Sequence, residues 1–219
     1  MKTCAAESPT ELISSAEMRA IEAQAIGSGK VSGRDLMEQA GQGVVDFILS
    51  QPDFRANDYA VVLCGPGNNG GDGYVIARLL AKAGWNIAVW SWGVPENLPL
   101  DARANWRLWS EIGPVSDLQD IDLGRSESGL VIDALFGIGL SRKIEGALAE
   151  KLGEIQDMQQ RCGASILAVD LPSGLETDTG EVLGTVLPAQ ATVTFHRPKP
   201  AHSLRPDLCG PVHVVDLGL

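Results

Sequence analysis

The sequence predicts an α/β fold of the doubly wound, Rossmann-like type, a mostly parallel sheet with helices on both faces. Short apolar runs alternate with stretches of helical period, which is the pattern of repeated βαβ units. The apolar runs are nearly continuous, as expected for strands buried on both faces of a parallel sheet. We see no internal repeat, low-complexity tract or linker. Residues 1–219 are therefore expected to form one three-layer α/β/α domain.

Two helices are expected before the first strand. Ser14 and Glu17 have the spacing of a capping box, and Gly27 ends the helical pattern that follows them. A second helix is expected in residues 33–52, where an apolar residue recurs every three or four positions and Pro52 marks the end.

The rest of the chain reads as strands alternating with helices. Strands are expected at 59–64 and 86–92, within 129–140, at the start of 165–174, and at 191–196 and 211–219. Helices are expected at 74–84, 101–113 and 146–163. The Pro-rich stretch 197–210 is expected to be a loop.

Composition excludes several classes of protein. The formal net charge of −11 argues against a protein that binds nucleic acid. No apolar run has the length of a membrane span, and the first residues lack a signal-peptide core, so we expect a cytoplasmic protein without membrane contact. Cys4, Cys64, Cys162 and Cys209 are scattered and indicate neither a disulfide framework nor a zinc site.

A glycine-rich segment follows the first predicted strand. Residues 65–70, Gly-Pro-Gly-Asn-Asn-Gly, match the G-x-G-x-x-G pattern of dinucleotide-binding turns. The acidic residue that normally binds the ribose, about 20 positions further on, is missing, because Trp92 and Gly93 end the second strand. The segment instead offers Asn68, Asn69 and Asp72, which suit a hard cation or the hydroxyl groups of a ligand as well as a phosphate.

Two further segments have unusual residues at predicted strand ends. Asp133 ends the third strand and is followed by Gly137, Gly139, Arg142 and Lys143. Asp170 ends the fourth strand, with Ser173 in the turn after it. An acid at the end of a buried strand is a candidate for a shifted pKa. Ligands bind beyond the carboxyl ends of strands in such sheets, so all three segments are expected to meet in one crevice.

The three histidines show no metal-ligand spacing. His196, His202 and His213 are expected at ordinary surface or strand positions. No nucleophile elbow, Ser/His/Asp set or Cys/His set is present in the sequence.

Five segments together resemble the YjeF N-terminal domain family. They are SAEMRAIEAQAI, CGPGNNGGDGYVIARLL, VIDALFGIGLSR, AVDLPSGLETDTG and TVTFHRPKPAH, and they occur in the family's order. The resemblance extends from about residue 12 to 218. His196 departs from it, because a small residue, often Gly, is expected before RPKP.

The resemblance implies an NAD(P)H-hydrate epimerase. Such enzymes interconvert the R and S forms of NADHX and NADPHX, damaged cofactors with a hydroxyl group at C6 of the nicotinamide ring. An S-specific dehydratase that uses ADP or ATP, sometimes fused C-terminally, then restores the cofactor. The family also suggests a homodimer formed through the N-terminal helices.

The resemblance also implies the site residues. The substrate would contact Asn68, Asn69, Gly70, Gly71, Asp72, Gly137, Ile138, Gly139, Leu140, Ser141, Arg142, Lys143 and Asp170. Asn69, Asp133 and Ser173 would hold a potassium ion (K⁺).

For the mechanism, our hypothesis gives Asp170 an acid/base role, with its negative charge stabilising a cation that forms after hydroxide leaves. A nucleotide-binding dimerisation scaffold without turnover is the first alternative. An oxidoreductase or methyltransferase on a similar sheet is the second, and the missing ribose-binding acid counts against it.

Overall fold

The computed structural model describes residues 11–55, 58–121 and 129–219. It contains a seven-stranded, fully parallel sheet with strand order β3-β2-β1-β4-β5-β6-β7. The chain starts in the middle of the sheet, builds outward in one direction, and then returns to build in the other, which defines a doubly wound fold. The strands are β1 (Tyr59–Cys64), β2 (Asn86–Ser91), β3 (Val115–Asp117), β4 (Leu130–Ala134), β5 (Ser165–Val169), β6 (Ala191–Phe195) and β7 (Val212–Val215).

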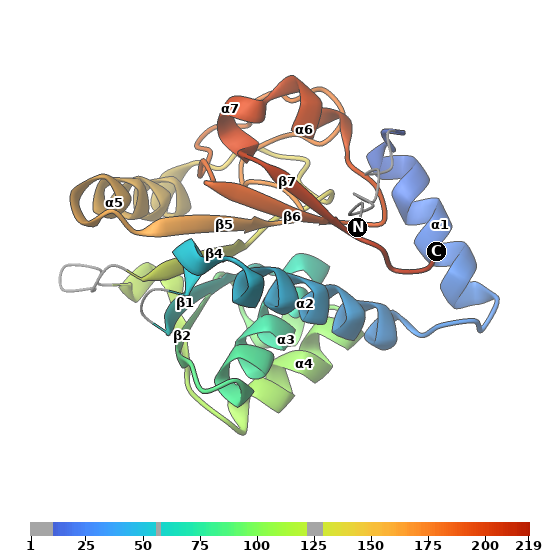
Figure 1. Ribbon diagram of the computed structural model, residues 1–219, viewed down its shortest axis with the longest axis horizontal. Helices are drawn as coiled ribbons and strands as arrows, with labels where there is room; N and C mark the ends of the chain where they lie inside the picture. Colours follow the sequence, from blue (N-terminus) through green and yellow to red (C-terminus); the bar gives the residue numbers. More distant parts are fainter. Residues whose placement is uncertain (1–10, 56–57, 122–128) are drawn as a thin grey trace, which may run out of the picture.

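Helices cover both faces of this sheet, so the predicted three-layer architecture is confirmed (Figure 1). One face carries α2, α3 and α4, and the other carries α5 with the short helices α6 and α7. Their bounds are α2 (Gly33–Ser50), α3 (Asn68–Lys82), α4 (Leu100–Ser110), α5 (Gly146–Cys162), α6 (Pro200–Leu204) and α7 (Pro206–Cys209). No helix in the described part of the chain is long and apolar enough to cross a membrane.

The central strands send alternate side chains to the two layers. In β1, Val62 packs in the cluster under α2 and α3, whereas Val61 and Leu63 pack in the cluster under α5. Every residue of β4 is buried, Asp133 included. This two-sided burial explains why these strands appear as continuous apolar runs in the sequence.

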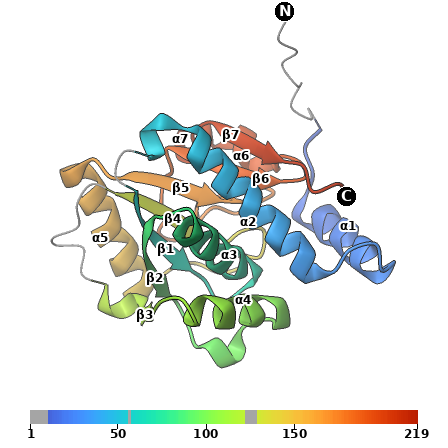
Figure 2. The ribbon, with the colours of Figure 1, turned by 60° about the horizontal axis from the view of Figure 1, so that its bottom comes forward.

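The first helix, α1 (Ser15–Gly27), lies apart from both layers. Figures 1 and 2 place it beyond the ends toward which β6 and β7 point, that is, at the carboxyl edge of the sheet. The predicted capping box is present, because the Ser14 hydroxyl accepts a hydrogen bond from the Glu17 N–H and the Glu17 carboxylate accepts from the Ser14 N–H. Met18 is the buried residue of this helix.

The structure corrects three expectations. The helix expected at 74–84 starts earlier, because α3 begins at Asn68 and contains Gly70, Gly71 and Gly73. The short edge strand β3 was not predicted; only three residues long, it has no apolar run that would reveal it. The Pro-rich stretch 197–210 contains α6 and α7, each of which begins at a proline, where the missing N–H is not needed.

Candidate active site

A cavity of about 490 Å³ opens at the carboxyl edge of the sheet. Its volume lies in the usual range for a small-molecule or cofactor site. Ten of the thirteen predicted substrate contacts line it, namely Asn68, Asn69, Asp72, Gly137, Ile138, Gly139, Leu140, Ser141, Arg142 and Asp170. The three segments at the strand ends therefore meet in one cavity, as the sequence predicted.

Three predicted contacts do not line the cavity described here. Gly70 and Gly71 face other parts of the protein: a Cβ atom on Gly70 would collide with the carbonyl oxygen of Gly65, and one on Gly71 would reach the Met37 Sδ atom at 2.5 Å. Both glycines let α3 approach its neighbours closely, and Met37 does line the cavity. Lys143 is exposed and also lies outside the lining.

Asp170 is the most extensively bonded carboxylate in the cavity. The Lys199 ammonium lies 2.8 Å from its Oδ1 atom, and the Thr194 hydroxyl donates to the same oxygen at 2.9 Å. The Ile138 N–H donates to Oδ2 at 3.1 Å. Burial alone would raise the pKa of Asp170, but the Lys199 charge and these hydrogen bonds outweigh it and lower the pKa.

The Gly137 position explains how Asp170 fits in this cavity. A Cβ atom on Gly137 would lie 2.5 Å from the Asp170 Oδ2 atom and 3.2 Å from the Asn69 Oδ1 atom. Only glycine leaves room for the two side chains to meet at this point. A Cβ atom on Gly139, in contrast, would meet no described atom within 4 Å.

Lys199 is buried beside Asp170 and was not predicted. Its side chain is 1% exposed, and its ammonium also donates to Thr194 Oγ1 at 2.7 Å and to the Phe195 carbonyl at 3.0 Å. The available signal was its position: Lys199 follows β6 in the RPKP segment, so a cation comes to the same sheet edge as Asp170.

His202 corrects the expectation of an ordinary surface position. It is buried in α6, and the Lys199 backbone N–H donates to its Nδ1 atom at 2.9 Å. The proton therefore lies on Nε2, which donates to the Asp170 carbonyl at 2.8 Å. Burial lowers the pKa of His202, so the ring is neutral and fixes the backbone at Asp170.

Asp133 and Ser173 form a second, fully buried polar pair next to the cavity. The Ser173 hydroxyl and N–H donate to the Asp133 carboxylate at 2.7 and 2.8 Å, and the Leu135 N–H donates at 3.2 Å. Burial raises the pKa of Asp133 to about 6, although these hydrogen bonds oppose the shift. The Ser173 hydroxyl also accepts from the Phe136 N–H at 3.0 Å, which ties the segment after β4 to the turn after β5.

Two further charged residues in the lining come from α1. Glu22 and Arg19 both line the cavity, and neither was predicted as a site residue. Their signal was present in the sequence, since Glu22 lies four positions after Met18, on the same side of the expected helix. The Arg19 guanidinium donates to the Ile138 carbonyl at 2.6 Å and connects α1 to the segment after β4.

Comparisons with known proteins agree with this site. The family model described as YjeF-related protein N-terminus matches residues 33–201. The chain is 44% identical to an NAD(P)H-hydrate epimerase of Rhodobacter capsulatus, over 89% of this chain and 92% of the relative. It is 41% identical to one of Roseobacter litoralis, over 95% and 99% of the two chains.

Two other comparisons extend the picture. A bifunctional NAD(P)H-hydrate repair enzyme of Moorella thermoacetica is 36% identical over 95% of this chain and 40% of its own length. The crystal structure of the yeast protein ynu0 shares the fold, with a TM-score of 0.73 and 22% identity over 91% of this chain and 86% of that chain. This chain is a member of the family of proteins related to the YjeF N-terminus.

Proposed function

We propose that this protein is an NAD(P)H-hydrate epimerase, an isomerase that interconverts the R and S forms of NADHX and NADPHX. The observation that carries the proposal is the cavity. Residues from the three segments that follow β1, β4 and β5 line one space of about 490 Å³. Relatives that match nearly their whole length carry this name, which supports the same activity here.

The proposed reaction opens and recloses the bond between C6 and its hydroxyl group. The ring nitrogen donates its lone pair as the hydroxyl leaves, and the resulting planar cation accepts water on either face. Asp170 would lie against this ring, where its negative charge stabilises the cation. The Lys199 and Thr194 contacts keep that carboxylate ionised and fixed in position before the substrate binds.

The start of α3 and the segment after β4 would hold the dinucleotide. Asn68 and Asn69 form the first turn of α3 at the cavity, and backbone N–H groups at a helix N-terminus favour phosphate oxygens. Arg142 adds a cation at the rim, and Lys143, which is exposed beside it, is proposed to reach the same phosphates.

A K⁺ site fits the residues that the family resemblance implies. Asp133 and Ser173 are joined by hydrogen bonds, and Asp133 keeps lone-pair capacity after accepting three of them. The buried Asn69 Nδ2 atom has no hydrogen-bond partner in the described part of the chain, but it is a donor, so the Oδ1 atom of this amide would be the one to contact the ion. Carboxylate, hydroxyl and amide oxygens are ligands for a hard cation. The three residues would hold the ion. Its positive charge would order the segment after β4 and the turn after β5.

The partners follow from the same proposal. The product would pass to an S-specific dehydratase that uses ADP or ATP, and the name of the Moorella relative, a bifunctional repair enzyme, supports a link between the two steps. We also propose a homodimer formed through the N-terminal helices. A cytoplasmic location, expected from the sequence, stays a prediction.

A coupled assay tests the epimerase function. Purified protein is given R-NADPHX together with an S-specific dehydratase and its nucleotide, and the return of reduced-nicotinamide absorbance is followed. We expect recovery well above the spontaneous rate. Recovery equal to the blank, from a folded protein that binds the nucleotide, would instead indicate a non-catalytic scaffold.

The Asp170→Asn variant tests the residue that we place against the ring. We expect it to bind the substrate and to lose most of the rate, because it removes the charge that stabilises the cation. Turnover close to that of the unchanged protein would contradict this role.

A further inference from the structure

The hydrogen bonds of Asp170 and Lys199 leave neither group ready to give up a proton. An ammonium group has three N–H donors, and Lys199 uses all of them on Asp170 Oδ1, Thr194 Oγ1 and the Phe195 carbonyl. Asp170 accepts hydrogen bonds on both oxygens, from Thr194 on one and from Ile138 on the other. A carboxylate held in this way is ionised and has no proton to transfer. The proton that the leaving hydroxyl group requires must come from another group.

Three other carboxyl groups line the same cavity, and Asp101 of α4 is one of them. Glu22 reaches it from α1 and Asp72 from α3, and both are half-buried. The hydrogen bonds of the described residues include none to either carboxyl group, so both are open to a ligand in the cavity. In contrast, Asp133, the other acid of the site, has its carboxylate bonded by three protein donors.

The surroundings favour a proton on this pair. Burial and the negative charges of Asp170 and Glu22 raise the pKa of Asp72 well above its ordinary value. Burial and the Asp170 charge raise the pKa of Glu22, while Lys199 and Arg19 oppose the rise. Like charges in a low-dielectric site cannot all ionise, so the pair retains a proton at higher pH than an exposed carboxyl group does.

We propose that Glu22 and Asp72 together form an acid/base pair that protonates the leaving C6 hydroxyl group and takes a proton back from the water that returns. This inference rests on the epimerase function proposed above. Asp170 and Lys199 are then a fixed ion pair that stabilises the cation, and acid/base chemistry belongs to α1 and α3.

The step balances without an oxidant or reductant. The pair gives one proton to the hydroxyl oxygen, the bond between C6 and that oxygen breaks, and water leaves while the ring nitrogen lone pair forms the C6=N1 bond. Water then attacks C6 on either face, the nitrogen recovers its lone pair, and the pair recovers its proton. Substrate and product differ only in the configuration at C6.

The pH dependence of this step is set by all charged groups that line the cavity. Besides Glu22 and Asp72, the charged residues of the lining are Arg19, Asp101, Arg142, Asp170 and Lys199. Since the pair must start protonated, we expect kcat to fall as pH rises through its apparent pKa. The Asp170 charge shifts this fall to higher pH, and the Lys199 and Arg19 charges oppose that shift at Glu22.

The test compares Glu22→Gln and Asp72→Asn with Asp170→Asn, using R-NADPHX and the coupled assay across pH. Intact NADPH serves as the binding probe, and circular dichroism checks the fold. Glu150→Gln on α5 is the matched control, because Glu150 is exposed and outside the cavity lining.

We expect kcat to fall about 100-fold or more in Glu22→Gln and in Asp72→Asn, the usual contribution of a placed proton donor. NADPH binding should change little in either variant. The decline of kcat with pH should move to lower pH in both variants, because each keeps one carboxyl group that has lost a like-charged neighbour. The decline should remain in Asp170→Asn, at a lower rate. Glu22→Asp should restore part of the activity, because it keeps a carboxyl group on α1.

Two results would overturn the inference and leave the epimerase function standing. One is a Glu22→Gln variant with the kcat and pH profile of the unchanged protein. The other is a slow Glu22→Gln variant whose pH-dependent decline stays at the same pH as in the unchanged protein, which would assign Glu22 a purely structural role. An unchanged, folded protein no faster than the spontaneous reaction would instead refute the proposed function itself.

Discussion

Two non-glycine residues near the site have left-handed backbone conformations. Asp170 has φ 68° and His196 has φ 63°. Such conformations cost about 1–3 kcal/mol each, and they concentrate at functional sites where the surrounding structure enforces them. At Asp170, the Val193 carbonyl and the His202 ring hold the backbone, and the resulting turn carries the carboxylate that we place against the ring. The strain at Asp170 is therefore consistent with a catalytic role.

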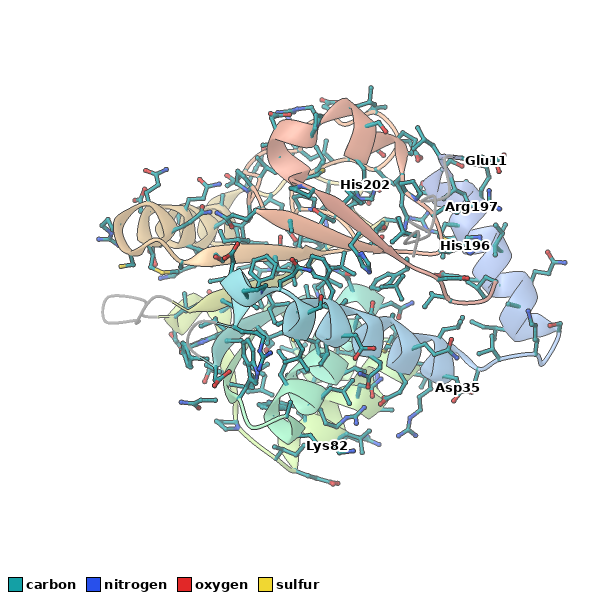
Figure 3. The ribbon with its side chains drawn as sticks, in the orientation of Figure 1. Glu11, Asp35, Lys82, His196, Arg197 and His202 are labelled. Atoms are coloured by element: carbon teal, nitrogen blue, oxygen red, sulfur yellow. The ribbon has the colours of Figure 1, made fainter. Side chains whose placement is uncertain are left out.

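His196 gives the first stability prediction. It follows β6 beside Arg197, which pairs with Glu11, and it is the position where the family resemblance led us to expect a small residue (Figure 3). Glycine adopts this conformation freely, whereas alanine does not. We expect His196→Gly to be more stable than His196→Ala by about 1 kcal/mol in urea unfolding. Equal stability of the two variants would show that the backbone at this position relaxes.

Lys199 gives the second prediction. Removing one partner of a buried ion pair leaves the other charge uncompensated, at a cost of about 3–5 kcal/mol. We therefore expect Lys199→Met to lower the free energy of unfolding by that amount at pH 8. The loss should be smaller at pH 5, because burial then raises the pKa of the unpaired Asp170 toward protonation.

Adding Asp170→Asn to Lys199→Met is the control for this prediction, since it removes the unpaired charge. The double variant should recover part of the lost stability. A loss below about 1 kcal/mol in Lys199→Met would contradict a desolvated pair and indicate a surface-like one.

At the scale of elements, α1 is attached to the rest of the protein by few contacts. Asp178 accepts hydrogen bonds from the Ser15 N–H and hydroxyl, both at 2.8 Å, and the Ile13 N–H donates to the Pro198 carbonyl at 3.0 Å. The Arg19 contact with Ile138 and the burial of Met18 add to this attachment. Because α1 carries Glu22, the proposed acid/base pair depends on these few bonds.

We therefore predict that Asp178→Ala loosens α1 without unfolding the sheet. Two hydrogen bonds to a charged group are lost, so the free energy of local opening of α1 should fall by about 1–3 kcal/mol. Amide exchange in α1 should become faster accordingly. KM should rise and kcat should fall, while exchange in β1 and β4 stays slow. Asp157→Ala, an exposed change on α5, is the control. Unchanged exchange in α1 would show that other contacts hold the helix.

The helices and strands could be predicted where burial requires a run of apolar residues. The strands β1, β4, β5 and β6 are apolar and lie within one residue of their predicted starts. The start of α3 was not predictable in this way, because Asn68 and three glycines of its first turns have low helix propensity. Packing against Gly65 and Met37 fixes the helix at this point, and such packing cannot be derived from local sequence.

At the scale of the whole molecule, some residues of the candidate site could be predicted from the sequence and others could not. Residues at strand ends, such as Asp133 and Asp170, could be predicted because topology alone brings strand ends together. The position of Lys199 after β6 indicates its sheet edge only, and a Pro-rich segment gives no sign that Lys199 and His202 fold back onto Asp170. The spacing of Glu22 from Met18 indicates its side of α1, but where α1 packs is a tertiary contact that no local pattern encodes.

The buried carboxyl groups also make the stability of the whole molecule depend on pH. A carboxyl group whose pKa is raised by folding contributes stability that is fully present below its ordinary pKa. That stability is lost as pH rises through the folded value. Asp72 is such a group, whereas the lowered pKa of Asp170 acts in the opposite sense, because its contribution is lost as pH falls.

We predict that Asp72→Asn removes part of the stability loss that accompanies rising pH. Its free energy of unfolding should decline less than that of the unchanged protein as pH rises from about 4 to 8, since the ordinary pKa of Asp is about 3.9. Urea unfolding at several pH values measures the two slopes. Parallel slopes would mean that Asp72 titrates normally in the folded protein, contrary to its burial.

The measurement that tests the central claim most directly follows a single epimer in isotopically labelled water. Pure R-NADPHX is incubated with the protein in H₂¹⁸O, and chiral chromatography with mass spectrometry follows the S form. If the enzyme opens and recloses the C6–O bond, the S form should appear far faster than in the blank and should carry ¹⁸O at C6. Appearance of the S form at the spontaneous rate, or its rapid appearance without ¹⁸O, would contradict the account.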